Sequence, residues 1–252
     1  MIRAFMVAIC FMATSARAET IVAGLSENRV AITANFDGSE LLIYGAVKRE
    51  EPSPTDFPLD VIITVEGPSQ PLVIRRKEWT GGIWINRSSV KIDSAPSFYA
   101  INTTGPLEKI LSGTEDLRHK ITIEKAIRAV GISNEARNSP EFVEGLLRVR
   151  TGEDRYRVAE GIVQLSQETL FRTDVVLPAN LTEGNYRVRI FLLRGGKVID
   201  VSENLVGVRK AGLERFLFRL AHEQPLTYGL ISLAIAAIAG WAASAGFRLL
   251  RS

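Results

Sequence analysis

The feature that most constrains this chain is an uncharged apolar stretch close to its C-terminus. Leu226 to Phe247 reads LTYGLISLAIAAIAGWAASAGF, which is 22 residues without a charged side chain, and only RLLRS follows it. A helix of about 20 apolar residues is long enough to cross the hydrocarbon core of a bilayer. The sequence therefore predicts a transmembrane helix over 226–247 and a short cytoplasmic tail over 248–252.

The N-terminus has the pattern of a secretory signal peptide. Arg3 supplies a positive charge, a short apolar run follows, and Ala16 and Ala18 are the small residues of a cleavage site. We expect cleavage between Ala18 and Glu19, which removes residues 1–18. The alternative is an uncleaved anchor, but about ten apolar residues are too few to span a bilayer comfortably.

The two ends together predict the topology of a single-pass membrane protein. The signal peptide exports the region from Glu19 onward, the apolar helix stops transfer, and the C-terminus stays in the cytoplasm. The positive-inside rule is less decisive here, because basic residues flank the apolar helix on both sides. We therefore base the orientation on the signal peptide.

Charge and cysteine content argue against nucleic-acid binding and against sites that depend on cysteine. Of the 31 basic residues, Arg3, Arg17, Arg248 and Arg251 lie outside residues 19–225, which leaves 27 basic residues there against 28 acidic ones. That balance offers no positive field for nucleic acid. The single cysteine, Cys10, lies in the signal peptide, so the mature chain has no disulfide and no cysteine metal site.

The hydrophobic pattern of the exported region predicts a mainly β fold with a helical insert. Residues 19–105 and 153–210 hold short β-branched apolar runs separated by turn residues, and Asp37-Gly38 is typical of a tight hairpin. Residues 106–152 change to helical periodicity, with the clearest helix starting at Ser139 and ending at Gly152.

One short motif indicates the class of β fold. The stretch from Leu181 to Tyr186 resembles the tyrosine corner of immunoglobulin-like sandwiches, with Val188 where antibody domains place a cysteine. We therefore expect an immunoglobulin-like β-sandwich. The sequence leaves open whether the two β segments form one sandwich or two.

Residues 211–225 predict an amphipathic helix next to the membrane. Arg215 and Arg219 lie on one side of it, where they could contact lipid phosphate in the headgroup layer. The equally weighted alternative is a simple rigid connector between the exported region and the transmembrane helix.

The sequence contains no catalytic motif in a suitable context. Ser88-Ser89-Val90-Lys91 matches S-x-x-K, but that serine must open a helix and here is expected to lie between strands. His119 and His222 are the only histidines, and no cysteine accompanies them. We therefore expect no enzyme activity, no metal and no cofactor.

Three segments resemble the alphaproteobacterial family of putative transmembrane proteins. They run from Gly82 to Leu107, from Leu170 to Val198 and from Gln224 to Trp241. The resemblance implies an inner-membrane protein with a periplasmic exported region. It carries over no catalytic residue, and it favours a role as an accessory to a permease similar to sulfite exporters.

Trp84, Asn86 and Tyr99 flank the densest part of the family-like sequence. Aromatic side chains beside an amide suit the recognition of a partner, so we name these three as candidate binding residues. The alternative is that they belong to the core, as aromatic residues in strands usually do.

The transmembrane helix carries a candidate packing face. Ser232, Ala236, Gly240 and Ser244 recur every four residues, so they stack on one side of a helix. Small side chains allow close helix packing in lipid, against a permease or a second copy of the chain. The alternative is chance, because 13 of the 22 residues are Ala, Gly, Ser or Thr.

Two functional hypotheses remain from the sequence. The first, which we favour, is a membrane-anchored periplasmic binding or interaction protein that acts beside an inner-membrane transporter. The second is an envelope hydrolase whose site forms only in the folded chain.

Overall fold

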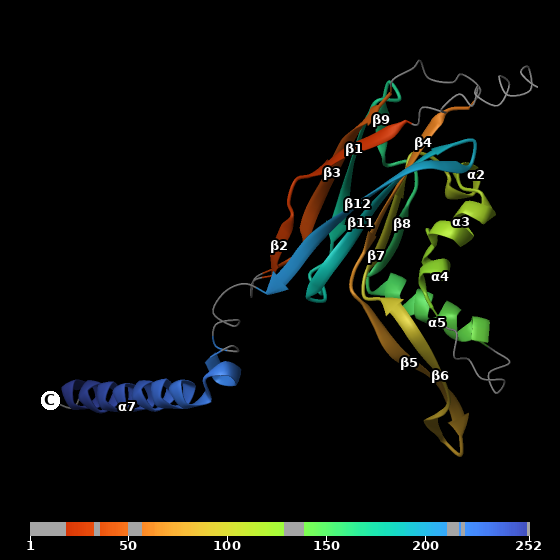
Figure 1. The fold of residues 1–252 in the computed structure, drawn as a ribbon. Helices are drawn as coiled ribbons and strands as arrows, with labels where there is room; N and C mark the ends of the chain where they lie inside the picture. The colour runs from red at the N-terminus through yellow and green to blue at the C-terminus, as the bar shows by residue number, and fades with distance from the viewer. Residues whose placement is uncertain are drawn as a thin grey trace, which may run out of the picture. The chain divides into compact units, whose positions relative to one another are not determined.

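Strands make up about half of the described part of the chain. The computed structural model describes residues 19–32, 36–49, 57–128, 139–210, 217 and 220–250. The chain divides into two compact units, one of Met1–Val30 and Asp37–Val208 and the other of Ala31–Phe36 and Arg209–Ser252. We call the described residues of the first unit the body. The expectation of a mainly β fold with short helices and one apolar C-terminal helix is confirmed (Figure 1).

A four-stranded antiparallel sheet forms one layer of the body. Its strands, in spatial order, are β1 (Thr20–Leu25), β3 (Ser39–Lys48), β10 (Leu170–Leu177) and β9 (Gln164–Ser166). Alternate residues of β10 are buried, as expected for a strand with one face on a core and one face in solvent.

A six-stranded sheet forms the centre of the body. Its strands, in spatial order, are β2 (Arg29–Ile32), β12 (Lys197–Lys210), β11 (Gly184–Arg194), β4 (Leu59–Glu66), β7 (Tyr99–Thr103) and β8 (Tyr156–Ala159). The pairing of β7 with β8 is parallel. Strand β4 is buried on both faces, so this sheet has a covered layer on each side.

Strands from both β segments of the sequence meet in both sheets. β3 pairs with β10 in the four-stranded sheet, and β4 pairs with β11 in the six-stranded sheet. The two segments therefore share one body.

A hydrogen bond between buried side chains joins the two sheets. Asn102 Nδ2 of β7 donates to Thr173 Oγ1 of β10 over 2.9 Å. Asn102 pairs with Ile63 of β4, and paired residues lie on the same face of a sheet. The Ile63 face of β4 therefore points toward the four-stranded sheet, and the opposite face carries Ile62.

Short helices cover that opposite face, as Figure 1 shows. They are α2 (Leu107–Ile110), α3 (Gly113–His119), α4 (Ile123–Ala126) and α5 (Ser139–Gly152). Ile62 and Tyr99 pack in one cluster with Phe142 and Leu146 of α5. The predicted start and end of the clearest helix, Ser139 and Gly152, are confirmed.

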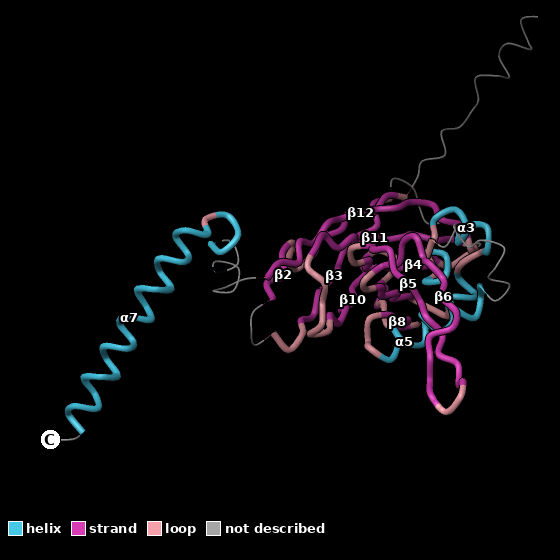
Figure 2. Tube along the Cα trace, turned by 90° about the horizontal axis from the view of Figure 1, so that it is seen from below, coloured by secondary structure: helices cyan, strands magenta, loops and turns pink. Residues whose placement is uncertain are grey.

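Strands β5 (Ser69–Thr80) and β6 (Ile83–Pro96) form a separate two-stranded hairpin that extends away from the larger sheets (Figures 1 and 2). Its base is part of the core, because Val90 and Ile92 are buried in the same cluster as α5. The sequence predicts strands over Leu72–Trp79 and Gly82–Asn86 at this place, and both observed strands are longer, the second reaching Pro96.

The hydrogen bond that defines a tyrosine corner is present. Tyr186 Oη donates to the Thr182 carbonyl oxygen over 2.9 Å, and the Tyr186 side chain is buried. Val188, two residues later, is also buried.

The predicted hairpin at Asp37-Gly38 is wrong. The strand before this turn, β2, lies beside β12, whereas the strand after it, β3, lies between β1 and β10. Gly38 has φ of 117°, a conformation that favours glycine. The glycine is therefore used where the chain crosses from one sheet to the other.

The second unit contains the helix α7 (Pro225–Leu250). Residues Pro225–Ser244 have a mean hydropathy of 1.7 and are long and apolar enough to cross a membrane. The predicted helix over 226–247 is therefore present. Ala18, most of the predicted helix over 211–225, and both Arg215 and Arg219 lie outside the described residues.

Candidate functional site

The tip of the β5–β6 hairpin is built for a tight turn. Gly81 and Gly82 have φ of 59° and 89°, and a Cβ added at either position would meet nothing within 4 Å. Two consecutive left-handed residues match the turn type that joins twisted strands with two residues. The turn places Trp79 directly opposite Trp84.

The two tryptophans form an exposed aromatic pair. Trp79 is 60% and Trp84 is 63% exposed, and their rings lie edge to face with centroids 5.4 Å apart. Ile83, between them in sequence, is 62% exposed. Large apolar side chains this exposed at the end of a projecting element are typical of a contact surface.

One face of the hairpin carries the aromatic pair together with basic residues. The register pairs Lys77 with Asn86, Arg75 with Ser89 and Val73 with Lys91, all on the same face as Trp79 and Trp84. All of these residues are exposed. We call this surface the cationic aromatic face and define it by six residues: Arg75, Lys77, Trp79, Trp84, Asn86 and Lys91.

The other face of the hairpin is fixed to α5. Arg76 pairs with Glu141 of α5 at 3.0 Å, and its guanidinium lies 5.6 Å from the centroid of the Phe142 ring. A hollow of about 200 Å³ between the hairpin and α5 is lined by Ile74 and Arg76 of the hairpin, by Arg148 of α5 and by neighbouring residues. The base of the hairpin is therefore held while its tip is free of the core.

The structure separates the three predicted binding residues. Trp84 and Asn86 lie together on the cationic aromatic face, whereas Tyr99 lies in β7 with no exposed surface. Tyr99 Oη donates to the Ile121 carbonyl oxygen over 2.9 Å and accepts from Arg189 Nη2 over 3.1 Å. Burial raises the pKa of Tyr99 to about 12. Tyr99 therefore contributes to the core and not to an exposed surface.

Sequence reasoning did not include Trp79 among the binding residues. The available indication was its position, because Trp79 and Trp84 bracket Gly81-Gly82 in the sequence. A two-glycine turn brings the residues on either side of it face to face.

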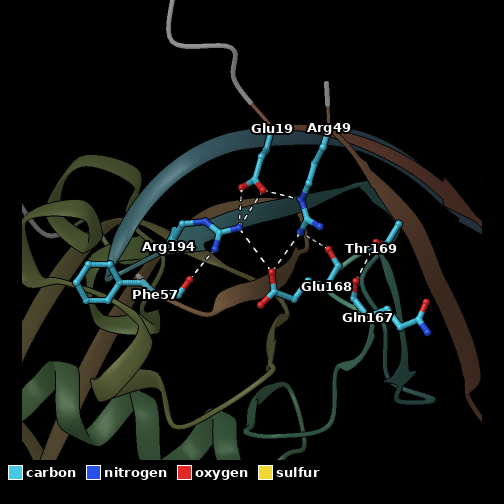
Figure 3. Close-up of polar contacts among 7 residues, drawn as sticks. All are labelled: Glu19, Arg49, Phe57, Gln167, Glu168, Thr169 and Arg194. Carbon is cyan, nitrogen blue, oxygen red and sulfur yellow. Dashed lines mark hydrogen bonds and ion pairs between the residues drawn. The ribbon is translucent and has the colours of Figure 1, made fainter. Parts of the chain in front are cut away.

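A second notable cluster gathers charges at one end of the body (Figure 3). Glu19 accepts from Arg49 Nε over 2.6 Å and from Arg194 Nη2 over 2.9 Å. Arg49 also donates to the Glu168 carbonyl oxygen, and Arg194 donates to the Phe57 carbonyl oxygen over 2.6 Å. The side chains of Glu19, Arg49 and Arg194 are 12%, 16% and 10% exposed, so solvent screens them little.

This cluster connects the two large sheets. Glu19 and Arg49 flank β1 and β3 of the four-stranded sheet, whereas Arg194 ends β11 of the six-stranded sheet. Gln167 and Glu168 both have φ of 49°, which is unfavourable for residues other than glycine. The contacts of Glu168 with the two arginines help to hold this turn.

The outer face of the four-stranded sheet is hollowed. Small residues, including Gly24 and Ala46, form the floor of a hollow of about 650 Å³, with Tyr44, Leu170 and Arg172 around it. Its volume lies in the range of small-molecule sites, but it is open to solvent along the sheet.

An acid–histidine pair lies on α3. Glu115 Oε2 is 3.3 Å from His119 Nε2, and the His119 ring packs edge to face on Phe191. Within the ranges that the structure describes, no group of three or more His, Cys, Asp or Glu side chains could hold a metal ion.

The predicted packing face of the apolar helix lies on α7. Ser232, Ala236, Gly240 and Ser244 are all exposed, and a Cβ added at Gly240 would meet nothing within 4 Å. The spacing of four residues places them on one side of α7.

Comparison with known proteins assigns the chain to a family. Residues 20–249 match the model of the family described as "Putative transmembrane protein (Alph_Pro_TM)". The chain belongs to this family. The resemblance noted in the sequence is thereby confirmed, and the family description agrees with the candidate membrane span on α7.

Other comparisons add little to the family assignment. No curated protein matches the chain. The crystal structure of Spo0M, a sporulation control protein from Bacillus subtilis, aligns with a TM-score of 0.28 at 11% identity, covering 77% of this chain and 50% of that chain. The chain thus spans half the length of Spo0M, and a likeness this weak carries no argument.

Proposed function

We propose that this family member is a membrane-anchored interaction protein of the periplasm. α7 crosses the inner membrane, the body lies in the periplasm, and the C-terminus lies in the cytoplasm. The observation that carries the proposal is the exposed Trp79–Trp84 pair at the tip of a hairpin whose base is buried in the core. A contact element needs both an exposed aromatic surface and a rigid support.

We further propose that the body is an immunoglobulin-like sandwich without a disulfide. The tyrosine corner at Tyr186, the buried Val188 and the hydrogen bond between Asn102 and Thr173 support this assignment. The helices α2 to α5 then form the insert that covers the free face of the six-stranded sheet.

The proposed role is that of an accessory to an inner-membrane transporter. The transporter is contacted within the bilayer by the small-residue face of α7, at Ser232, Ala236, Gly240 and Ser244. Lipid-embedded helices associate through close packing, which small side chains permit. The same face could pair two copies of the chain.

Photo-crosslinking tests the hairpin as a contact element. A photoreactive amino acid is placed at Trp84 in the full chain in membranes, and the same residue is placed at Leu205, which is 60% exposed on β12. We expect crosslinked protein or lipid at Trp84 well above the Leu205 level. Equal capture at both positions would remove the hairpin from the proposed function.

Crosslinking of a second pair of variants tests the contact within the bilayer. Gly240→Leu keeps the helix apolar but fills the small face, and Ile235→Leu is the control off that face. We expect Gly240→Leu alone to lose a complex, whose mass distinguishes a transporter from a second copy. If both variants keep the complexes of the parent chain, α7 is only an anchor.

Reporter fusions test the orientation. A reporter that is active only in the cytoplasm should work when fused after Ser252 and be silent when fused at Arg209. The opposite pattern would contradict both the periplasmic body and the cleaved signal peptide.

The Glu115–His119 pair favours one alternative function, an envelope hydrolase. A carboxylate beside a histidine orients the imidazole as a general base. Labelling of the purified chain by a serine-reactive fluorophosphonate, abolished in His119→Ala, would support this alternative. If neither the parent chain nor the His119→Ala variant is labelled, the result contradicts the hydrolase and favours the interaction protein.

A further inference from the structure

We propose that the cationic aromatic face of the hairpin binds the surface of an anionic lipid bilayer. This inference rests on the proposed function in taking the hairpin as a contact element and α7 as a membrane anchor. It is independent of the transporter, which the proposed function places against α7.

The first observation is the distribution of charge on the hairpin. Between Val73 and Lys91 the cationic aromatic face holds Arg75 and Lys77 and no carboxylate. The carboxylate of Glu78 belongs to the opposite face, where Arg76 at 3.3 Å and Arg87 at 3.9 Å hold it. An anionic surface that approaches the cationic aromatic face therefore meets cations, aromatic rings and uncharged side chains, but no carboxylate.

The second observation is the contrast with the rest of the exported region. Residues 69–96 contain five basic and two acidic residues, which is a formal charge of +3. The other residues of 19–208 contain 18 basic and 24 acidic residues, a formal charge of −6. An anionic bilayer attracts the hairpin and repels the remainder, so charge selects which part of the body approaches the lipid.

The third observation is the kind of apolar residue at the tip. Tryptophan is enriched at membrane interfaces, where its ring lies among the headgroups. Trp79, Trp84 and Ile83 are all more than half exposed and occupy the end of the hairpin. Arg75 and Lys77 follow further from the tip, at positions where their charges can reach lipid phosphates while the tryptophans enter the interface.

The fourth observation is that the chain carries a candidate membrane span of its own. The candidate span Pro225–Ser244 lies in the same polypeptide as the hairpin. A site tethered to a surface meets that surface at a high effective concentration. The bound state of the hairpin is therefore populated even if its intrinsic affinity for lipid is weak. The bilayer is therefore the occupant that chemistry and tethering both favour.

Tryptophan fluorescence of the reconstituted full chain tests the proposal. The chain has three tryptophans, and in a Trp241→Phe background only Trp79 and Trp84 emit. The protein is placed in vesicles of phosphatidylcholine and phosphatidylglycerol, made with either ordinary or brominated acyl chains. We expect brominated lipid to reduce the emission about twofold or more, because rings at the interface lie near the acyl chains.

Charge variants separate lipid binding from simple proximity. Arg75→Gln with Lys77→Gln should restore most of the emission in brominated vesicles, as should pure phosphatidylcholine or high salt. The matched control is Arg157→Gln, which removes an exposed cation of β8 outside the hairpin. That control should quench like the parent chain.

Two outcomes would overturn the lipid proposal, and others bear on the proposed function. Emission equal in ordinary and brominated vesicles overturns it, and so does quenching that is unchanged by the charge variants and by salt. If protein crosslinks at Trp84 without quenching, the hairpin remains a contact element and its partner is a protein. The crosslinking result for Gly240→Leu bears only on the contact of α7 with a transporter or a second copy. It does not test whether the hairpin binds lipid.

Discussion

Trp84 and Tyr99 are both aromatic residues of β strands in one short stretch of sequence, yet they have opposite environments. Trp84 is 63% exposed at the tip of a two-stranded hairpin. Tyr99 lies in β7, between β4 and β8, with helices over its face. The difference shows that the number of neighbouring layers, and not the residue type, decides whether an aromatic residue supports the core or remains available for contact.

Truncation of the buried aromatic residue should have the largest effect on stability. Tyr99→Ala removes a fully buried ring and its hydrogen bonds, so we expect a loss of about 3–5 kcal/mol in the free energy of unfolding of the body. Pulse proteolysis of the full chain in detergent measures this loss. A loss below about 1 kcal/mol would contradict the core assignment.

The free energy of unfolding should fall at alkaline pH because of buried tyrosines. Burial raises the pKa values of Tyr99 and Tyr156 to about 12, above the unfolded value of about 10. Their stabilisation is complete below pH 10 and is lost as the pH rises from 10 to 12, by up to about 2–3 kcal/mol for each tyrosine.

The double variant Tyr99→Phe, Tyr156→Phe provides the control for this pH dependence. Phenylalanine cannot ionise, so the double variant should lose most of the slope of stability against pH above 10. A slope equal to that of the parent chain would assign the alkaline loss to other groups.

The comparison extends from aromatic residues to charges. Glu19 is only 12% exposed and contacts two arginines, so Glu19→Gln should cost about 1–2 kcal/mol by weakening a shielded cluster. The matched control is Glu183→Gln, which changes an exposed carboxylate and should cost less than about 0.5 kcal/mol. Chemical unfolding of both variants checks the difference, and equal costs would show that the cluster is solvated.

The smallest effect is expected at the hairpin tip. Trp84→Ala removes a mostly exposed ring, so the stability of the body should change by no more than about 0.5 kcal/mol. Thermal unfolding followed by circular dichroism provides the measurement. A large loss of stability would show that Trp84 packs in the core, as Tyr99 does, and would contradict the comparison.

Local features of the fold could be read from the sequence because neighbouring residues determine them. The tyrosine corner at Tyr186 and the helix from Ser139 to Gly152 depend on short-range patterns, and both are present. The apolar helix near the C-terminus follows from its composition in the same way.

Features that depend on distant residues could not be read from the sequence. Asp37-Gly38 has the residues of a hairpin turn, but the partner of β2 is β12, far along the chain. The contact of Glu19 with Arg194 likewise joins residues 175 positions apart. The burial of Tyr99 depends on the helices that cover β7, which no periodicity within β7 indicates.

The order of strands in the six-stranded sheet has a consequence for biogenesis. β12, the last strand of the body in sequence, lies between β2 and β11 and separates one of the earliest strands from the rest of the sheet. The sheet therefore cannot close until the chain has been synthesised almost to α7. Pairings across such long sequence separations form slowly and leave strand edges unpaired in the meantime. We expect newly made chains to depend on chaperones until residue 210 has been synthesised.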